Sequence, residues 1–199
     1  MAAYQGGPLN VESVRNLLRG GNAALLVGLT ESEWFEAKSA AYNIDAPGTT
    51  GERQKIELAQ DVARFANAEH DAVLVIGLKE GKEHAVEAVT PVPIGAISAD
   101  RYRAVLDARI IPPVEGLLLE QIELGGGVGL LMLSIPRQAE ALQPFLVHGA
   151  VVGDKVEGAF FSIVRRRGEG SIVTNAAQIH AYIVAGRAFL RNHSAGGSS

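Results

Sequence analysis

The stretch AVLVIGL (72–78) is an uninterrupted apolar run between the polar pair His70–Asp71 and the segment Lys79–Gly81. A short continuous run of this kind, rich in β-branched residues, is typical of a central strand that is buried on both faces. The preceding segment, GERQKIELAQDVARFANAE (51–69), repeats apolar residues at helical spacing. We therefore expect a helix at 51–69, with Arg64 on its outer side, packed on a sheet built around 72–78.

The rest of the chain supplies further helices and strands in irregular alternation. This order predicts an α/β (α+β) fold with a mixed β-sheet flanked by helices. In chain order we expect a helix at 10–21 capped by Asn10, strands at 33–38 and 84–92, a helix at 98–110 capped by Ser98, a hairpin of 117–124 with 130–135, further strands within 146–164 and a last helix at 175–190. The predicted core contains Phe35, Val62, Phe65, Val73, Val75, Leu131, Leu133 and Ile183.

Composition bounds the class of protein. The chain has 199 residues with 47% apolar content, which is enough for one packed domain. We expect a helical extension at 1–27, a domain at 28–190 and a flexible tail at 191–199. Without any cysteine, disulfides, thiolate metal sites and cysteine nucleophiles are excluded. No apolar run reaches the length of a membrane span and the N-terminal residues do not resemble a signal peptide, so we expect a cytoplasmic protein without membrane contact.

Charge is divided unevenly along the chain. The formal net charge is −4, and most of the acidic excess lies within residues 31–90. Residues 160–199 carry five arginines against the single Glu169. This division fits a basic rim beside an acidic pocket, as an enzyme that cuts a polyanion would need. Scattered solvated charges on an acidic protein explain it equally well.

The segment ESEWFEAKS (31–39) contains the first candidate site. In an extended strand, Glu36 and Lys38 point to the same face, roughly 6–7 Å apart. Glu31 lies an odd number of residues from Glu36, so it can reach Glu36 only if residues 30–32 form a turn. The carboxylates could then hold a metal, and Lys38 could contact a phosphate. A solvated strand edge with an exposed Glu36–Lys38 ion pair is the alternative.

Three consecutive arginines, Arg165, Arg166 and Arg167, form the second candidate site. In a strand, alternation places Arg165 and Arg167 on one face and Arg166 on the other. Arginine is well suited to contact phosphates, so this segment is the best candidate for binding nucleic acid. The alternative is an edge strand whose charges prevent aggregation.

Several short motifs recur here in the order and spacing of the Schlafen AlbA_2 family, which the chain resembles over roughly residues 28–188. The residue pair His70–Asp71 departs from the pattern, because relatives usually have paired glycines at this point. The matching motifs are ExxxxExK at Glu31, Glu36 and Lys38, FAN-x-E at 65–69, LVIGL at 74–78, IIPP at 110–113, SIPR at 134–137, Pro144, and VRRRG with a following serine at 164–171.

The resemblance implies a protein that binds nucleic acid, DNA or RNA. It also implies an alternative activity, a metal-dependent endoribonuclease that cleaves tRNA or other structured RNA through Glu31 and Glu36, with Mg²⁺ or Mn²⁺ as cofactor. Lys38 would assist, and Glu80 or Asp71 would supply a third carboxylate. By analogy with Alba-like domains, a homodimer is plausible. A regulatory module that binds a protein partner is a further alternative.

Overall fold

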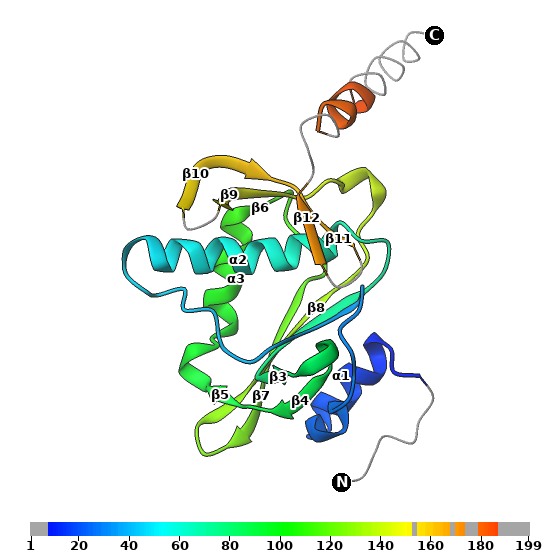
Figure 1. Ribbon diagram of the computed structural model, residues 1–199, viewed down its shortest axis with the longest axis vertical. Helices are drawn as coiled ribbons and strands as arrows, with labels where there is room; N and C mark the ends of the chain where they lie inside the picture. Colours follow the sequence, from blue (N-terminus) through cyan, green and yellow to red (C-terminus); the bar gives the residue numbers. More distant parts are fainter. Residues whose placement is uncertain (1–7, 153–154, 168–169, 174–178, 187–199) are drawn as a thin grey trace.

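The computed structural model describes residues 8–152, 155–167, 170–173 and 179–186 (Figure 1). It confirms the predicted α/β class with a mixed sheet. The helices are α1 (Val11–Arg19), α2 (Gly48–Ala66) and α3 (Ala99–Arg109), with a further helical segment at 179–186. The strands are β1 (Phe35–Lys38), β2 (Ala72–Ile76), β3 (Leu78–Glu80), β4 (Val86–Val89), β5 (Val92–Pro93), β6 (Ile110–Ile111), β7 (Leu118–Gly125), β8 (Val128–Ile135), β9 (Leu146–Val152), β10 (Lys155–Ser162), β11 (Val164–Arg167) and β12 (Gly170–Val173).

The main sheet has the pairing order β1-β2-β8-β5, and β7 also pairs with β8. Strands β2 and β5 lie along one edge of β8, and β7 lies along its other edge. Strands β1 and β2 are parallel, whereas β2, β5 and β7 each pair with β8 in antiparallel fashion. Every residue of β2 is buried. The strand predicted from residues 72–78 is therefore central, as its continuous apolar sequence indicates.

Both faces of the sheet are covered, which explains why β2 has no polar face. Leu74 and Ile76 belong to a core cluster that includes the apolar side of α2. Val73 and Val75 belong to a second cluster with residues of α1. In Figure 1, α2 and α1 accordingly lie on opposite sides of the sheet. A strand between two apolar layers must be apolar throughout.

The chain turns away from the main sheet at Gly77. This residue has φ of +100°, and a Cβ built there would lie 2.4 Å from Leu130 Cδ2, so only glycine fits. Beyond the turn, β3 pairs with β4 in a separate two-stranded sheet. The strand expected at 84–92 is therefore shorter, and it pairs with Leu78–Glu80.

Two helix caps were predicted, and the structure confirms one of them. The side chain of Asn10 accepts a hydrogen bond from the Ser13 amide at 2.8 Å, so it caps α1. Ser98 precedes α3 but makes no side-chain capping bond. The helix expected at 51–69 forms as α2 between Gly48 and Ala66, so it begins and ends three residues earlier.

A second layer lies over α2, which contacts both β9 and β11 (Figure 1). Strands β10, β9 and β6 form one small sheet, and β11 pairs with β12 in another. Seven of the eight predicted core residues are fully buried, whereas Ile183 is 56% exposed. Its prediction as a core residue was wrong, because the helical segment 179–186 is exposed rather than packed through its apolar stripe. Within the described ranges, no helix has the length and apolar character needed to span a membrane.

Candidate functional site

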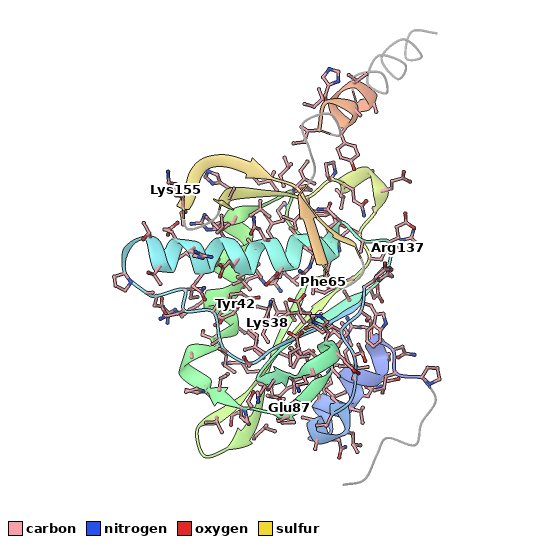
Figure 2. All side chains as sticks on the ribbon, in the orientation of Figure 1. Lys38, Tyr42, Phe65, Glu87, Arg137 and Lys155 are labelled. Atoms are coloured by element: carbon pink, nitrogen blue, oxygen red, sulfur yellow. The ribbon has the colours of Figure 1, made fainter. Side chains whose placement is uncertain are left out.

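Strand β1 places Glu36 and Lys38 on the face that looks toward α2. Lys38 Nζ lies 2.6 Å from Glu36 Oε1, which confirms that the two side chains are neighbours. The same amine lies 3.4 Å from Asp61 Oδ2 of α2. Arg64, one helical turn further along α2, pairs with the other carboxylate oxygen of Glu36. Figure 2 shows Lys38 at this junction between β1 and α2.

The pair of Glu36 and Arg64 is buried, with side chains only 5% and 7% exposed. The sequence predicted Arg64 on the outer side of the helix and Glu36 on a site open to solvent, and the burial of both side chains corrects both expectations. Arg64 Nη2 also lies 3.4 Å from Asp61 Oδ1. Two carboxylates and two cations thus neutralise one another, which is the usual requirement for burying charge.

Tyr42 completes this group by donating its hydroxyl proton to Asp61. We refer to Glu36, Lys38, Tyr42, Asp61 and Arg64 as the charge cluster. Burial, together with the negative charge of Asp61, raises the pKa of Tyr42 well above its ordinary value, so the phenol remains protonated and acts as a donor. The cluster holds β1 against α2.

A pocket of about 380 Å³ opens beside the charge cluster. Lys38 of β1 and Tyr42 of the following loop line it, together with Gln54, Glu57, Gln60 and Asp61 of α2. This lining contains both donors and acceptors. Because Lys38 is held by two carboxylates, the pocket does not have the strong positive charge expected of a phosphate site.

Glu31 is folded back by a turn before β1, as the spacing of the motif required. The Glu31 amide donates to the carbonyl of His84 at 2.8 Å, and Ser32 donates to the carbonyl of Phe35 at 3.0 Å. The turn directs the Glu31 carboxylate to the backbone of β1, where Oε1 accepts the Ala37 amide at 2.9 Å. Glu31 thereby caps the outer edge of β1, while Glu36 lies within the charge cluster.

Glu31 is instead brought together with Glu80 and His84. One ligand atom from each of these side chains lies within 4.8 Å of the others. Glu80 ends β3, and its carboxylate contacts Nδ1 of His84 in the turn that leads to β4. A carboxylate and imidazole set of this kind can hold a divalent transition metal ion. Of the predicted metal ligands, the group includes Glu31 and Glu80, and it adds His84.

His84 was not predicted as a ligand, because the five histidines of the chain show no HxH or HxxxH pairing. The sequence feature that could have indicated His84 as a ligand is its spacing from Glu80, which places an imidazole four residues after a carboxylate. Their contact depends on a tight turn in which Glu83 and His84 have φ of +63° and +55°. Such left-handed residues are uncommon outside glycine, so the sequence does not predict this turn.

Asp71, proposed from the sequence as another metal ligand, lies at the start of β2. The parallel register pairs Glu36 with Leu74, so Asp71 is displaced from Glu36 by three residues, or about 10 Å along the strand. The Asp71 carboxylate accepts the Arg137 amide at 2.8 Å. It therefore anchors the chain after β8 and is not a member of the group around Glu31.

Arg165, Arg166 and Arg167 lie in β11, which confirms that the arginine segment is a strand. Their side chains are outside the described part of the structure. Their cross-strand partners in β12 are Ile172, Ser171 and Gly170.

The start of β11 is attached to the end of α2. The side-chain amide of Asn67 donates to the carbonyls of Val164 and Phe145, both at 3.1 Å. Its oxygen accepts the Phe145 amide at 2.8 Å. Asn67 thus joins the end of α2 to the start of β11.

The chain is thus an α/β protein with a mixed sheet. Its candidate functional regions are the buried charge cluster, the group of Glu31, Glu80 and His84, and the arginine strand β11. No protein-family profile matches the chain, and no curated protein resembles it in sequence. Among solved structures it is similar to the DIP2311 protein from Corynebacterium diphtheriae, at 16% identity with a TM-score of 0.41. The match covers 76% of this chain and 27% of that protein, so the chain spans about a quarter of its length.

Proposed function

We propose that this protein binds nucleic acid through the hairpin of β11 and β12. The observation that carries the proposal is the run of Arg165, Arg166 and Arg167 along a single strand. The cross-strand partners of these arginines carry no acidic group. Alternation places Arg165 and Arg167 on one face of the strand, and two guanidinium groups on one face suit contacts with phosphates of a polyanion. The short motifs that resemble the Schlafen AlbA_2 family imply the same function, although no family profile matches the chain.

Many cations in the described part of the chain are already paired with carboxylates. The paired cations include Arg15, Arg19, Lys38, Arg53, Lys55, Arg64, Lys79, Arg101 and Arg109. Such pairs leave little net attraction for a polyanion. In the sequence, Arg165, Arg166 and Arg167 are consecutive and Glu169 is the single acidic residue of 160–199, so this segment carries a local excess of positive charge even though the whole chain is acidic.

Binding of labelled single-stranded RNA and double-stranded DNA, followed by fluorescence anisotropy at low salt, tests the proposal. Replacing Arg165 and Arg167 with Ala should weaken binding about tenfold or more, since hydrogen bonds to charged groups contribute roughly 1.5–3 kcal/mol each. The matched control replaces Arg53 and Arg101 with Ala, which removes the same charge from α2 and α3. Absence of binding by the unchanged protein, or an equal loss in the control, would refute the assignment to the hairpin.

A second candidate function is the metal-dependent cleavage of structured RNA at Glu31, Glu80 and His84. The grouping of their ligand atoms favours it. These residues would hold the ion, which would supply an activated water and stabilise the leaving oxygen when bound. The mixture of carboxylate and imidazole ligands suits Mn²⁺ better than Mg²⁺, which strongly prefers oxygen ligands. Glu36 contributes through the charge cluster, by holding β1 in place.

Thermal unfolding with and without Mn²⁺ tests the metal site independently of activity. An ion that binds only the folded protein raises the melting temperature. The rise should disappear in Glu31→Gln and His84→Ala but persist in the control Glu87→Gln, which alters an exposed carboxylate of β4. In parallel, cleavage of tRNA should require Mn²⁺ and fail in the same two variants. A melting temperature that does not respond to Mn²⁺ would exclude this site.

A further inference from the structure

Strand β7 leaves one of its sides unpaired. In the part of the chain that the structure describes, it pairs with β8 alone. Most of its residues are exposed, including Leu118 at 44% and Leu124 at 38%. A long exposed edge strand with apolar side chains is a template for pairing with another strand. It is therefore a candidate interaction surface.

The pairing of the main sheet determines which backbone groups of β7 point outward. The amides of Val73 and Gly77 donate to the carbonyls of Trp34, just before β1, and of Lys38, its last residue, so the odd-numbered residues of β2 face β1. The even-numbered residues of β2 must then face β8, and Leu74 is paired there with Leu133. Consequently, the odd-numbered residues of β8 face β2 and its even-numbered residues face β7.

The register between β7 and β8 completes this assignment. Ser134, Met132 and Leu130 of β8 pair with Leu118, Glu120 and Ile122 of β7. These three residues of β7 therefore direct their amides and carbonyls toward β8. The intervening residues, Leu119, Gln121 and Glu123, direct theirs toward the open edge.

We propose that β7 pairs with β7 of a second copy of this chain, antiparallel and with Gln121 on the two-fold axis. Outward-facing residues then meet one another, since Gln121 lies opposite its own copy and Leu119 lies opposite Glu123 of the second copy. Continuing this register, Leu118 lies next to Leu124 of the second copy, which is at the bulge of β7 between Glu123 and Gly125. Each of the two exposed leucines thereby gains an apolar cross-strand neighbour, and the two main sheets join into one.

Charge and strand length select this register over its neighbours. A two-fold axis at Glu120 would place two glutamates directly opposite each other, which is unfavourable. An axis at Ile122 would place Leu118 opposite residue 126, beyond the end of the partner strand. With the axis at Gln121, no like charges are opposed. An axis at Glu120 would also place Leu124 opposite residue 116, before the start of the partner strand, so strand length favours Gln121 even though Arg19 pairs with Glu120, at 3.0 and 2.7 Å.

Cysteine cross-linking tests both the interface and its register, because the natural chain has no cysteine. In Gln121→Cys the two thiols would face each other across the axis, with Cα atoms about 5.5 Å apart, within disulfide range. Mild oxidation should therefore convert this variant to a covalent dimer. Glu123→Cys is the control, since its thiols would be displaced by four residues, or roughly 13 Å. Cross-linking of Glu123→Cys but not of Gln121→Cys would overturn the register.

Sedimentation velocity tests the interface without oxidation. The unchanged protein should sediment as a dimer, and Gln121→Pro should sediment as a folded monomer, because proline removes only an outward-facing amide. Leu118→Glu should also weaken the dimer. The matched control Ile111→Glu, which alters a leucine-sized exposed side chain of β6, should not. A monomer at every concentration, or a dimer that survives both β7 variants, would overturn the proposal.

Discussion

The replacement Glu36→Gln tests whether the charge cluster is a structural element. This change keeps the shape of the side chain but removes its charge. It leaves Lys38 and Arg64 with Asp61 as their remaining anion in the cluster, so one positive charge is in excess. Because the side chain of Arg64 is only 7% exposed, water cannot compensate for this charge effectively.

The loss of stability expected for Glu36→Gln follows from the distances in the charge cluster. Removing one partner of a buried ion pair usually destabilises a protein by about 3–5 kcal/mol. Asp61 remains 3.4 Å from both cations, so we expect about 3 kcal/mol, at the lower end. For a chain of this size, each 1 kcal/mol lowers the melting temperature by roughly 2–4 °C. The expected decrease is therefore about 6–12 °C, measured by circular dichroism.

Two further variants separate this effect from a general loss of charge. Glu12→Gln removes a carboxylate that is 63% exposed and pairs with Arg15, so it should change stability by less than about 0.5 kcal/mol. Glu36→Leu combined with Arg64→Met removes both buried charges and should recover most of the lost stability. A loss below about 1 kcal/mol for Glu36→Gln, or a loss equal to that of Glu12→Gln, would refute the reasoning.

Three other positions give separate tests by urea unfolding. Burial raises the pKa of Tyr102 to about 12. The unfolded state therefore loses the Tyr102 proton first, and the free energy of unfolding should fall between pH 10 and 12. The free energy of unfolding of Tyr102→Phe should fall less steeply over the same range. Asn67→Ala should cost roughly 2–3 kcal/mol, because three hydrogen bonds are lost, two to Phe145 just before β9 and one to Val164 of β11; an unchanged midpoint would contradict this. Gly77→Ala should cost about 2 kcal/mol or more through its φ of +100° and its contact with Leu130, and a neutral effect would show that the turn relaxes.

Strong local patterns made much of the fold predictable. The apolar run of β2, the amphipathic repeat of α2 and the glycine-separated strands of β7 and β8 each specify one structure. The exposed segment 179–186 shows the limit of such patterns. Its apolar stripe resembles that of a core helix, but burial of Ile183 would require a tertiary contact that periodicity does not encode.

The candidate site was less predictable, because its composition depends on how separate segments meet. The motif around Glu31 correctly required a turn, yet the direction of that turn is set by the bridge between Thr30 and Ala85. This bridge brings Glu31 to His84, far away in sequence. Arg64 was expected in solvent because charged residues seldom lie in a helix interface. Its burial depends on Glu36, which reaches it only after β1 docks on α2.

The salt dependence of nucleic-acid binding tests the central claim most directly. Each phosphate contact contributes about −0.7 to −0.9 to the slope of log affinity against log salt concentration. If Arg165 and Arg167 each contact a phosphate, replacing both with Ala should reduce the magnitude of the slope by about 1.4–1.8, whereas replacing Arg53 and Arg101 should leave it unchanged. Identical slopes for the unchanged protein and the Arg165→Ala, Arg167→Ala variant would contradict the claim that this hairpin binds nucleic acid.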